Sequence, residues 1–447
     1  MADFPLIRHA RGDAPFAYRG NDPISAEQFL WDVAQLAALL PARKHLLNLC
    51  TDRYRFIVGF AAALQRRQIN LLPPNHTPGL IAQLSLHYPD VYCLTEASGA
   101  HPALETVDYP SSTTVGPVSQ QIPAFPAAQV AAIVFTSGST GQPLPYPKTW
   151  GGLVQGALAA AERFGLQAHP GMGILGTVPP QHMYGLESTV LLALQSGLAL
   201  HASRPFYPAD IHAQLDALPR PRGLVTTPVH LRALLAEFSH LPALDFLLCA
   251  TAPLSSQLAI EAEARFAAPL YEIYGCTEAG QVAARCTAMS DEWQTFRGVR
   301  LRQDAQGTWV GGGHVETETL LNDRLELRTP ETFLLHGRAA DLINIAGKRT
   351  SLSHLNYHLN AIPGVCDGVF VMPEETGREV TRLMAFVVAP GVSGDTIMDA
   401  LRQRIDAVFL PRPLHFVQAL PRNATGKLPR EALHQLLSQL ALKEASR

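Results

Sequence analysis

The sequence predicts an α/β fold with a large N-terminal domain and a small, mobile α+β C-terminal domain. Strand-like and helix-like segments alternate up to about residue 274, an order typical of parallel-rich sheets with crossover helices. From Val299 onwards the predicted segments are short and β-rich. The polar run at 337–341 then precedes a separate α+β unit. We predict an N-terminal domain at 1–337, a hinge at 338–341 and a C-terminal lid domain at 342–447.

Caps and hydrophobic periods define the elements of the large domain. Ser25-Ala26-Glu27-Gln28 is a capping box, which opens a helix with one apolar face from Phe29 to Leu40. Strands are predicted at 45–50, 69–72, 91–94, 173–178, 224–226, 246–248 and 270–274. Helices are predicted at 52–67, 79–87, 153–164, 187–195 and 256–267.

Two further regions complete the chain. Residues 97–129, rich in Pro, Ser, Thr and Gln, indicate a long connection without regular structure. Beyond the boundary we expect strands around Val369 and at 384–388, with helices at 353–361, 396–408 and 429–442.

Charge and composition argue against several classes of protein. The net charge of −3 over 447 residues leaves no basic excess to neutralise nucleic-acid phosphates. Residues 1–13 lack the apolar core of a secretory signal, and no apolar run reaches the length of a membrane span. The six cysteines are scattered, which favours core thiols over ligands or disulfides. We therefore expect a cytoplasmic protein without a nucleic-acid partner or a membrane span.

A stretch rich in glycine and hydroxyl groups follows the apolar strand Val130–Phe135. It reads Thr136-Ser137-Gly138-Ser139-Thr140-Gly141 and is followed, after a proline-rich segment, by Lys148. Glycines let backbone N–H groups converge on one point, and hydroxyls add donors, so the stretch suits a phosphate. Lys148 would supply a compact positive charge. Taken alone, the stretch is equally compatible with a flexible turn.

Three other segments combine residues that could carry chemistry. Tyr274-Gly275-Cys276-Thr277-Glu278 ends a predicted strand, where α/β sheets place ligands. There an aromatic ring can lie on a base, a hydroxyl can reach phosphate, and a carboxylate can hold Mg²⁺. The second segment spans the boundary at 337–349, and the third is Pro421–Lys427. Each alone is also compatible with a strand-end turn, a polar linker or a surface loop.

In this order the four segments resemble the adenylate-forming superfamily of acyl-CoA synthetases, aryl-acid ligases and peptide-synthetase adenylation domains. The patterns TSG[ST]TGxPK, YGxTE, GRxDDxIKxxGxR and PRxxxGK all have counterparts between about residues 130 and 430. The resemblance implies ATP and Mg²⁺ as cofactors and a reaction in two steps. A carboxylate attacks the α-phosphate of ATP to give acyl-AMP and pyrophosphate, and a thiol then displaces AMP. Such chemistry depends on positioning and charge stabilisation.

The resemblance also implies roles for individual residues. Lys427 would bridge the substrate carboxylate and the α-phosphate, and Glu278 would bind the metal ion. The implied catalytic set is Lys427, Thr277, Glu278 and Arg338. The implied ATP-binding set is Thr136, Ser137, Gly138, Ser139, Thr140, Gly141, Lys148, Thr251, Ala252, Tyr274, Gly275, Thr277, Asp323, Arg338 and Arg349. Within this set, Thr251 and Ala252 belong to the segment Ala250–Leu254, which resembles the family's GGAPL segment beside the adenine. The segment containing His182, Tyr184 and Gly185 resembles the family's substrate site, although a structural role for His182 is equally compatible with the sequence.

Several positions depart from the family patterns. Leu144 stands where the phosphate loop has its lysine, and Pro147-Lys148 resembles the same Pro-Lys pair displaced by four residues. Ala340 replaces the first aspartate of the DD pair at the family's hinge. Rotation about residues 338–341 is still expected, because a hinge needs only a few residues that tolerate backbone change.

The compact chain, with FTSGSTGQPLPYPKTW at 135–150 and DLINIAGKRTSL at 341–352, resembles most closely the stand-alone ligases of bacterial aryl-polyene and xanthomonadin pigment biosynthesis. These proteins activate a hydroxybenzoate and load it onto an acyl carrier protein. We therefore predict a hydroxybenzoate or another small aryl or carboxylic acid as substrate and a carrier-protein phosphopantetheine thiol as acceptor. One alternative is an acyl- or aryl-CoA synthetase that uses free CoA. A second is a catalytically weak relative that binds a nucleotide or an acyl group.

Overall fold

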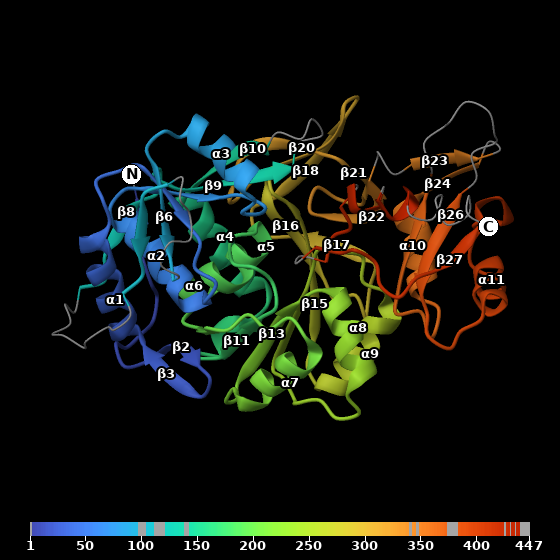
Figure 1. The fold of residues 1–447 in the computed structure, drawn as a ribbon, viewed down its shortest axis with the longest axis horizontal. Coiled ribbons are helices and arrows are strands. Elements are labelled where there is room, and N and C mark those ends of the chain that lie inside the picture. The colour runs from blue at the N-terminus through green and yellow to red at the C-terminus, as the bar shows by residue number, and fades with distance from the viewer. Residues whose placement is uncertain are drawn as a thin grey trace.

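A computed structural model confirms the predicted fold class: a large N-terminal α/β domain is followed by a smaller C-terminal domain (Figure 1). The C-terminal domain, orange to red, lies at the end of the long axis away from the N-terminus. The structure describes residues 2–96, 104–110, 121–137, 143–338, 342–345, 348–372, 383–423, 426–429, 431–433 and 435–438.

One six-stranded sheet forms the N-terminal part of the large domain. Its strand order is β10-β9-β5-β4-β6-β7, and all neighbours are parallel except β10 and β9, which form a hairpin. The strands are β4 (His45–Asn48), β5 (Ile69–Leu72), β6 (Val91–Thr95), β7 (Thr106–Asp108), β9 (Val130–Ser137) and β10 (Pro143–Thr149). The helices of this region are α1 (Ala26–Leu39), α2 (Arg53–Gln65) and α3 (Pro78–His87).

An eleven-stranded sheet forms the rest of the large domain's framework, in the order β21-β22-β17-β16-β15-β14-β13-β11-β12-β2-β3. Its centre, from β15 to β2, is parallel, and both flanks are antiparallel. The strands are β2 (Pro15–Arg19), β3 (Asp22–Ser25), β11 (Gly173–Gly176), β12 (Ala199–His201), β13 (Arg222–Thr226), β14 (Phe246–Cys249), β15 (Leu270–Cys276), β16 (Gly280–Arg285), β17 (Glu292–Thr295), β21 (Asp323–Leu327) and β22 (Thr332–Arg338).

Helices cover and connect these sheets. Helix α2 contacts strands of both, including β4 and β5 on one side and β12 on the other, so it lies between them. The remaining helices are α4 (Trp150–Arg163), α5 (Met183–Gly185), α6 (Leu192–Ser196), α7 (Pro208–Ala217), α8 (Pro228–Glu237) and α9 (Ser256–Phe266), with a short 3₁₀ turn at Leu166–Ala168. Two small sheets pair β1 (Asp3–Pro5) with β8 (Ala124–Pro126), and β18 (Arg300–Asp304) with β19 (Gly307–Gly312) and β20 (Val315–Leu321).

The C-terminal domain has its own hydrophobic core. That core includes Leu355, Leu359, Phe370 and Ile397, and all of its buried members come after residue 342. Its elements are β23 (Leu342–Ile345), β24 (Lys348–Ser351), α10 (Leu352–Asn360), β25 (Asp367–Val371), β26 (Met384–Val388), α11 (Gly394–Arg402), a 3₁₀ turn (Ala407–Phe409) and β27 (Leu414–Phe416). A separate core is what a domain needs if it is to move as a unit.

The structure corrects several of the predicted elements. The helix predicted at 187–195 begins instead at Met183 and contains a π-helical segment, Leu186–Leu191, between α5 and α6. The predicted connection at 97–129 contains β7 and β8 among its described residues, and the helix predicted at 396–408 ends at Arg402. The hairpin of β2 and the edge strand β3 was not predicted, because Pro15 and Pro23 are residues that strands usually avoid. Of the closing helix, 431–433 and 435–438 are helical.

Candidate active site

The phosphate-loop stretch lies at the end of the β9–β10 hairpin. Thr136 and Ser137 end β9, whereas Gly138, Ser139, Thr140 and Gly141 lie outside the described residues. The two strands pair without interruption from Pro143 opposite Ser137 to Lys148 opposite Ala132. The segment between Leu144 and Lys148 is therefore ordinary paired strand, and it does not form an inserted loop.

Lys148 lies in the stem of this hairpin. At the usual strand rise it lies roughly 17 Å further along β10 than Pro143. Its Nζ donates a hydrogen bond to the backbone carbonyl of Glu278 at 2.6 Å. Burial lowers the pKa of Lys148, although the nearby carboxylates, led by Glu187, act in the opposite direction. The amine thus contacts the predicted metal-binding segment, and its contact with phosphate stays a prediction.

Strand β15 brings several of the predicted nucleotide residues together. Tyr274 is buried, and its hydroxyl donates to Asp323 Oδ2 at 2.8 Å. Its ring packs edge-on against Phe333 and Trp293, with centroids 5.5 and 5.8 Å away. Asp323 is in turn opposite Arg338 in the β21–β22 ladder. Residues far apart in the sequence therefore meet beside β15, and their contacts with ATP stay predictions.

The turn between β15 and β16 carries the predicted metal ligand. Thr277 and Glu278 are both half-buried there, directly after β15. The backbone at 275 lies so close to Gly280 that only glycine fits, because a Cβ on Gly275 would lie 2.4 Å from the Gly280 carbonyl oxygen. A small cavity of about 70 Å³ is lined by Glu278, Lys148 and Glu187, among others. A carboxylate beside such a space is a suitable ligand for Mg²⁺, which prefers oxygen donors.

The segment predicted to lie beside adenine has an unusual backbone. Thr251 has φ of +84°, in a region that side chains with a branched Cβ rarely adopt. Its Oγ1 is buried and has no hydrogen-bond partner among the described residues. Ala252 and Leu254 follow, and the Leu254 N–H donates to Glu272 Oε1 at 3.3 Å. The sequence suggested this segment by its likeness to a glycine-rich motif, but it did not reveal the strain at Thr251.

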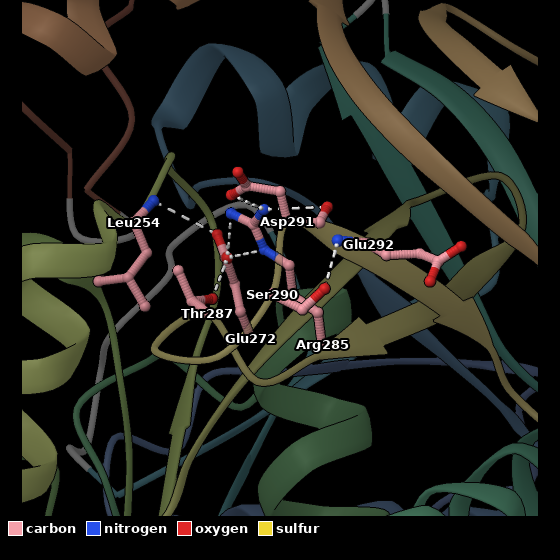
Figure 2. A network of polar contacts seen from close by, with 7 residues as sticks. All are labelled: Leu254, Glu272, Arg285, Thr287, Ser290, Asp291 and Glu292. Carbon is pink, nitrogen blue, oxygen red and sulfur yellow. Dashed lines mark hydrogen bonds and ion pairs between the residues drawn. The ribbon is translucent and has the colours of Figure 1, made fainter.

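Figure 2 shows the polar network that holds this segment against the sheet. The Glu272 carboxylate is buried on β15, where it pairs with Arg285 of β16 at 2.8 Å and accepts from the Thr287 hydroxyl at 2.7 Å. Burial raises the pKa of Glu272, and the Arg285 charge is the largest influence that lowers it. Sequence reasoning missed this pair, because neither residue belongs to a recognisable motif.

The predicted substrate segment lies at the start of α5. His182 is neutral at pH 7, because burial, and secondarily the charge of Lys427, lower its pKa to about 4. The Tyr184 hydroxyl lies 3.0 and 3.1 Å from the carbonyl oxygens of Thr226 and Leu248, so it ties α5 to β13 and β14. A Cβ at Gly185 would lie 2.0 Å from the Pro179 carbonyl oxygen, so only glycine fits there.

The loop of the predicted adenylation lysine reaches this region from the C-terminal domain. A Cβ at Gly426 would lie 3.5 Å from Thr227 Oγ1 and 3.7 Å from Thr251 Oγ1. The adjacent Lys427 is exposed, and its positive charge contributes to lowering the pKa of His182. Two contacts shape the loop: Arg422 forms a bidentate pair with Asp367 at 2.6 and 2.8 Å, and it donates to the Gly426 carbonyl at 2.9 Å.

Arg349 lies on a hairpin of the C-terminal domain. It belongs to β24, opposite Asn344 of β23. This hairpin is joined to the large domain where the Ser351 hydroxyl donates to the His336 carbonyl of β22 at 3.1 Å. Of the hinge, residues 339–341 lie outside the described residues. Within the residues that are described, no helix is both long and apolar enough to cross a membrane.

Comparison with known proteins agrees with this geometry. The chain matches the AMP-binding enzyme family over residues 43–306 and the AMP-binding enzyme C-terminal domain over residues 359–427. It belongs to the AMP-binding enzyme family. Among curated relatives, a 4-coumarate–CoA ligase of Rhodobacter capsulatus is 29% identical over 67% of this chain and 75% of its own. A 2-succinylbenzoate–CoA ligase of Bacillus cereus is 26% identical over 71% and 72%.

Solved structures share the whole architecture. The o-succinylbenzoate CoA synthetase of Bacillus subtilis, in complex with an acyl-adenylate intermediate, has a TM-score of 0.78 at 17% identity, covering 97% of this chain and 98% of its own. ATP-bound MatB from Rhodopseudomonas palustris has a TM-score of 0.77 at 16% identity, covering 95% and 97%. The family is that of AMP-forming acid–thiol ligases, so the chain is an ATP-using enzyme of this class.

The first prediction concerns the buried pair of Figure 2. Glu272→Gln removes the buried carboxylate charge at 2.8 Å from Arg285 and leaves the exposed Asp291, at 3.4 Å, as its carboxylate partner, so we expect the free energy of unfolding to fall by roughly 3 kcal/mol. Urea denaturation measures this loss. The control is Glu318→Gln, which removes an ion pair with Arg302 whose side chains are 48% and 49% exposed, and it should cost less than about 1 kcal/mol. Equal losses of unfolding free energy in both variants would contradict the conclusion that the Glu272–Arg285 pair is buried and stabilises the fold.

The second prediction tests whether Lys427 lies near His182. Removing the lysine charge takes away one of the causes that lower the pKa of His182, so Lys427→Ala should raise that pKa. The titration of the His182 ring, followed by NMR and assigned with His182→Asn, measures the change. Lys44→Ala, at an exposed lysine before β4, serves as the control and should leave the pKa unchanged. An unchanged pKa in Lys427→Ala would show that the lysine does not approach this histidine.

Proposed function

We propose that this enzyme activates a small carboxylic acid, such as a hydroxybenzoate or another aryl acid, as acyl-AMP. The acyl group then passes to the phosphopantetheine thiol of an acyl carrier protein. The observation that carries the proposal is the approach of the 426–427 loop to Thr227, Thr251 and His182. This contact brings a lysine from one domain to the predicted substrate and adenine segments of the other.

The charges of the site suit the first half-reaction. A carboxylate oxygen of the acid attacks the α-phosphorus of ATP, and pyrophosphate leaves. Lys427 would neutralise both the attacking carboxylate and the α-phosphate, which otherwise repel each other. His182 would stay neutral at this stage, because its pKa is about 4. The remaining contribution of the site is to hold the two substrates in line.

Other residues would bind the nucleotide. Tyr274 and Asp323, joined by their hydrogen bond, would hold the adenosine, with Thr251 and Ala252 beside the base. Glu278 would hold Mg²⁺, which supplies charge neutralisation at the phosphates. In the second half-reaction the thiol sulfur attacks the carbonyl carbon, and AMP leaves with the former carboxylate oxygen.

We also propose the domain division expected from the sequence, with residues 338–341 as the hinge between 1–337 and 342–447. The separate hydrophobic core of the C-terminal domain supports this division. Rotation about the hinge would withdraw Lys427 after adenylation and open the site to the thiol. A cytoplasmic location would supply ATP and the thiol acceptor.

Free CoA is the rival acceptor. The two curated relatives described above are named as CoA ligases, which favours it. The resemblance of the sequence motifs to the pigment-pathway ligases favours a carrier protein as acceptor and a hydroxybenzoate as substrate. A relative named as a 3-hydroxybenzoate–CoA/4-hydroxybenzoate–CoA ligase of Thauera aromatica is 33% identical over 109 residues, or 23% of this chain, which adds support for an aryl acid.

The experiment that tests the activity is carboxylate-dependent exchange of labelled pyrophosphate into ATP, across aromatic and aliphatic acids. We expect exchange with an aryl acid and a loss of roughly 10²-fold or more in Lys427→Ala, because a group that stabilises transition-state charge is removed. Lys44→Ala should retain full exchange. Absence of exchange with every acid would favour the reading of a catalytically weak binding protein.

The acceptor is settled by following thioester formation from the same acid. We expect faster transfer to a holo carrier protein than to CoA at equal thiol concentration, because carrier-protein contacts add binding energy remote from the reacting thiol. The readout is the mass of the acylated carrier protein and of acyl-CoA. Preferred transfer to CoA would replace the carrier-protein proposal with the CoA synthetase.

A further inference from the structure

Glu187 is a buried acid that the proposed reaction does not use. It lies in the π-helical segment Leu186–Leu191 and is 7% exposed. Its Oε1 accepts a hydrogen bond from the Gln281 N–H at 3.2 Å. The same oxygen would lie 2.7 Å from a Cβ on Gly280, whose φ is +81°, so this position requires glycine. The carboxylate is thus pressed against one side of the turn at 278–281.

Lys148 contacts the same turn at its first residue. It comes from β10, which is paired with β9, and its Nζ donates to the Glu278 carbonyl at 2.6 Å. The Lys148 charge acts on Glu187, and both side chains line the cavity of about 70 Å³ beside Glu278. Burial raises the pKa of Glu187 to about 7, and the Lys148 charge acts against that rise.

The two residues therefore bind one short turn through two different backbone groups. One accepts from the backbone N–H of Gln281, and the other donates to the backbone carbonyl of Glu278. We propose that Lys148 and Glu187 are positioning residues that clamp this turn and fix the Glu278 carboxylate for Mg²⁺–ATP. This inference rests on the proposed function, because it takes Glu278 as the metal ligand.

The clamp also links two nucleotide-binding elements. The β9–β10 hairpin carries the phosphate-loop stretch, and the 278–281 turn carries the metal ligand. Because Lys148 belongs to the hairpin stem, its hydrogen bond to Glu278 fixes the hairpin relative to the turn. Leu144 stands on the same strand at the position where the family has its lysine. The lysine of this chain therefore contacts the 278–281 turn from a position four residues further along β10. Partners behind a metal ligand set its orientation and commonly change metal affinity by about 10–100-fold.

The test is Mn²⁺ binding in the presence of saturating ATP, followed by EPR, together with the Mg²⁺ dependence of pyrophosphate exchange. We expect Lys148→Met and Glu187→Gln each to weaken Mn²⁺ binding by roughly tenfold or more. Lys148→Arg, which keeps a cationic donor, should recover most of the affinity. Thermal unfolding checks that each variant is folded, and Glu187→Gln tests the clamp independently if Lys148→Met does not fold.

The matched control is Glu316→Gln. Glu316 lines the same cavity, but it is exposed and accepts from the Thr149 hydroxyl at 2.6 Å, and among the described residues it has no hydrogen bond to the 278–281 turn. This variant should bind Mn²⁺ as the wild type does. An equal loss in Glu316→Gln, or unchanged affinity in Lys148→Met and Glu187→Gln, would overturn the clamp. If the wild type binds Mn²⁺–ATP with the expected variant pattern but exchanges no pyrophosphate, the proposed function fails and the clamp stands.

Discussion

The buried Glu272–Arg285 pair is the interaction on which the nucleotide side of the site depends. Glu272 lies in the middle of β15, two residues before Tyr274 and shortly before the 277–278 turn. Its second carboxylate oxygen accepts from the Leu254 N–H. One side chain therefore fixes the segment predicted beside adenine to the strand that leads to the metal ligand. A buried charge is stable only when its partners surround it, so these elements must keep their relative positions.

The second constraint is the shape of the loop in the C-terminal domain that places Lys427 against the large domain. The bidentate Arg422–Asp367 pair and the hydrogen bond to the Gly426 carbonyl shape the loop before it reaches the large domain. Gly426 then approaches Thr227 and Thr251, and its φ of +75° favours glycine at this point of the loop. A preformed loop costs less entropy when it closes, so its lysine can be delivered in a defined position.

Local patterns allowed the sequence to predict the fold class and most of the elements. Apolar runs and caps are local signals, and they identified β15, α1 and the C-terminal α+β unit. The site motifs could also be predicted from the sequence, because each motif is a short, local run of residues. The contacts between them were not predicted, because Lys148 and Glu278 are 130 residues apart, and Glu187 and Gln281 are 94 apart. The charges in these contacts are isolated in the sequence, so only the folded chain reveals their partners.

The central claim is that the reaction passes through an acyl-adenylate, and it is tested most directly by following the oxygen atoms of the substrate carboxylate. The acid is supplied with ¹⁸O in its carboxylate, and the products are examined by mass spectrometry after thioester formation. Attack on the α-phosphorus followed by thiol displacement predicts that one ¹⁸O atom appears in AMP and none in pyrophosphate. Label in inorganic phosphate with formation of ADP, or unlabelled AMP, would contradict an acyl-adenylate intermediate.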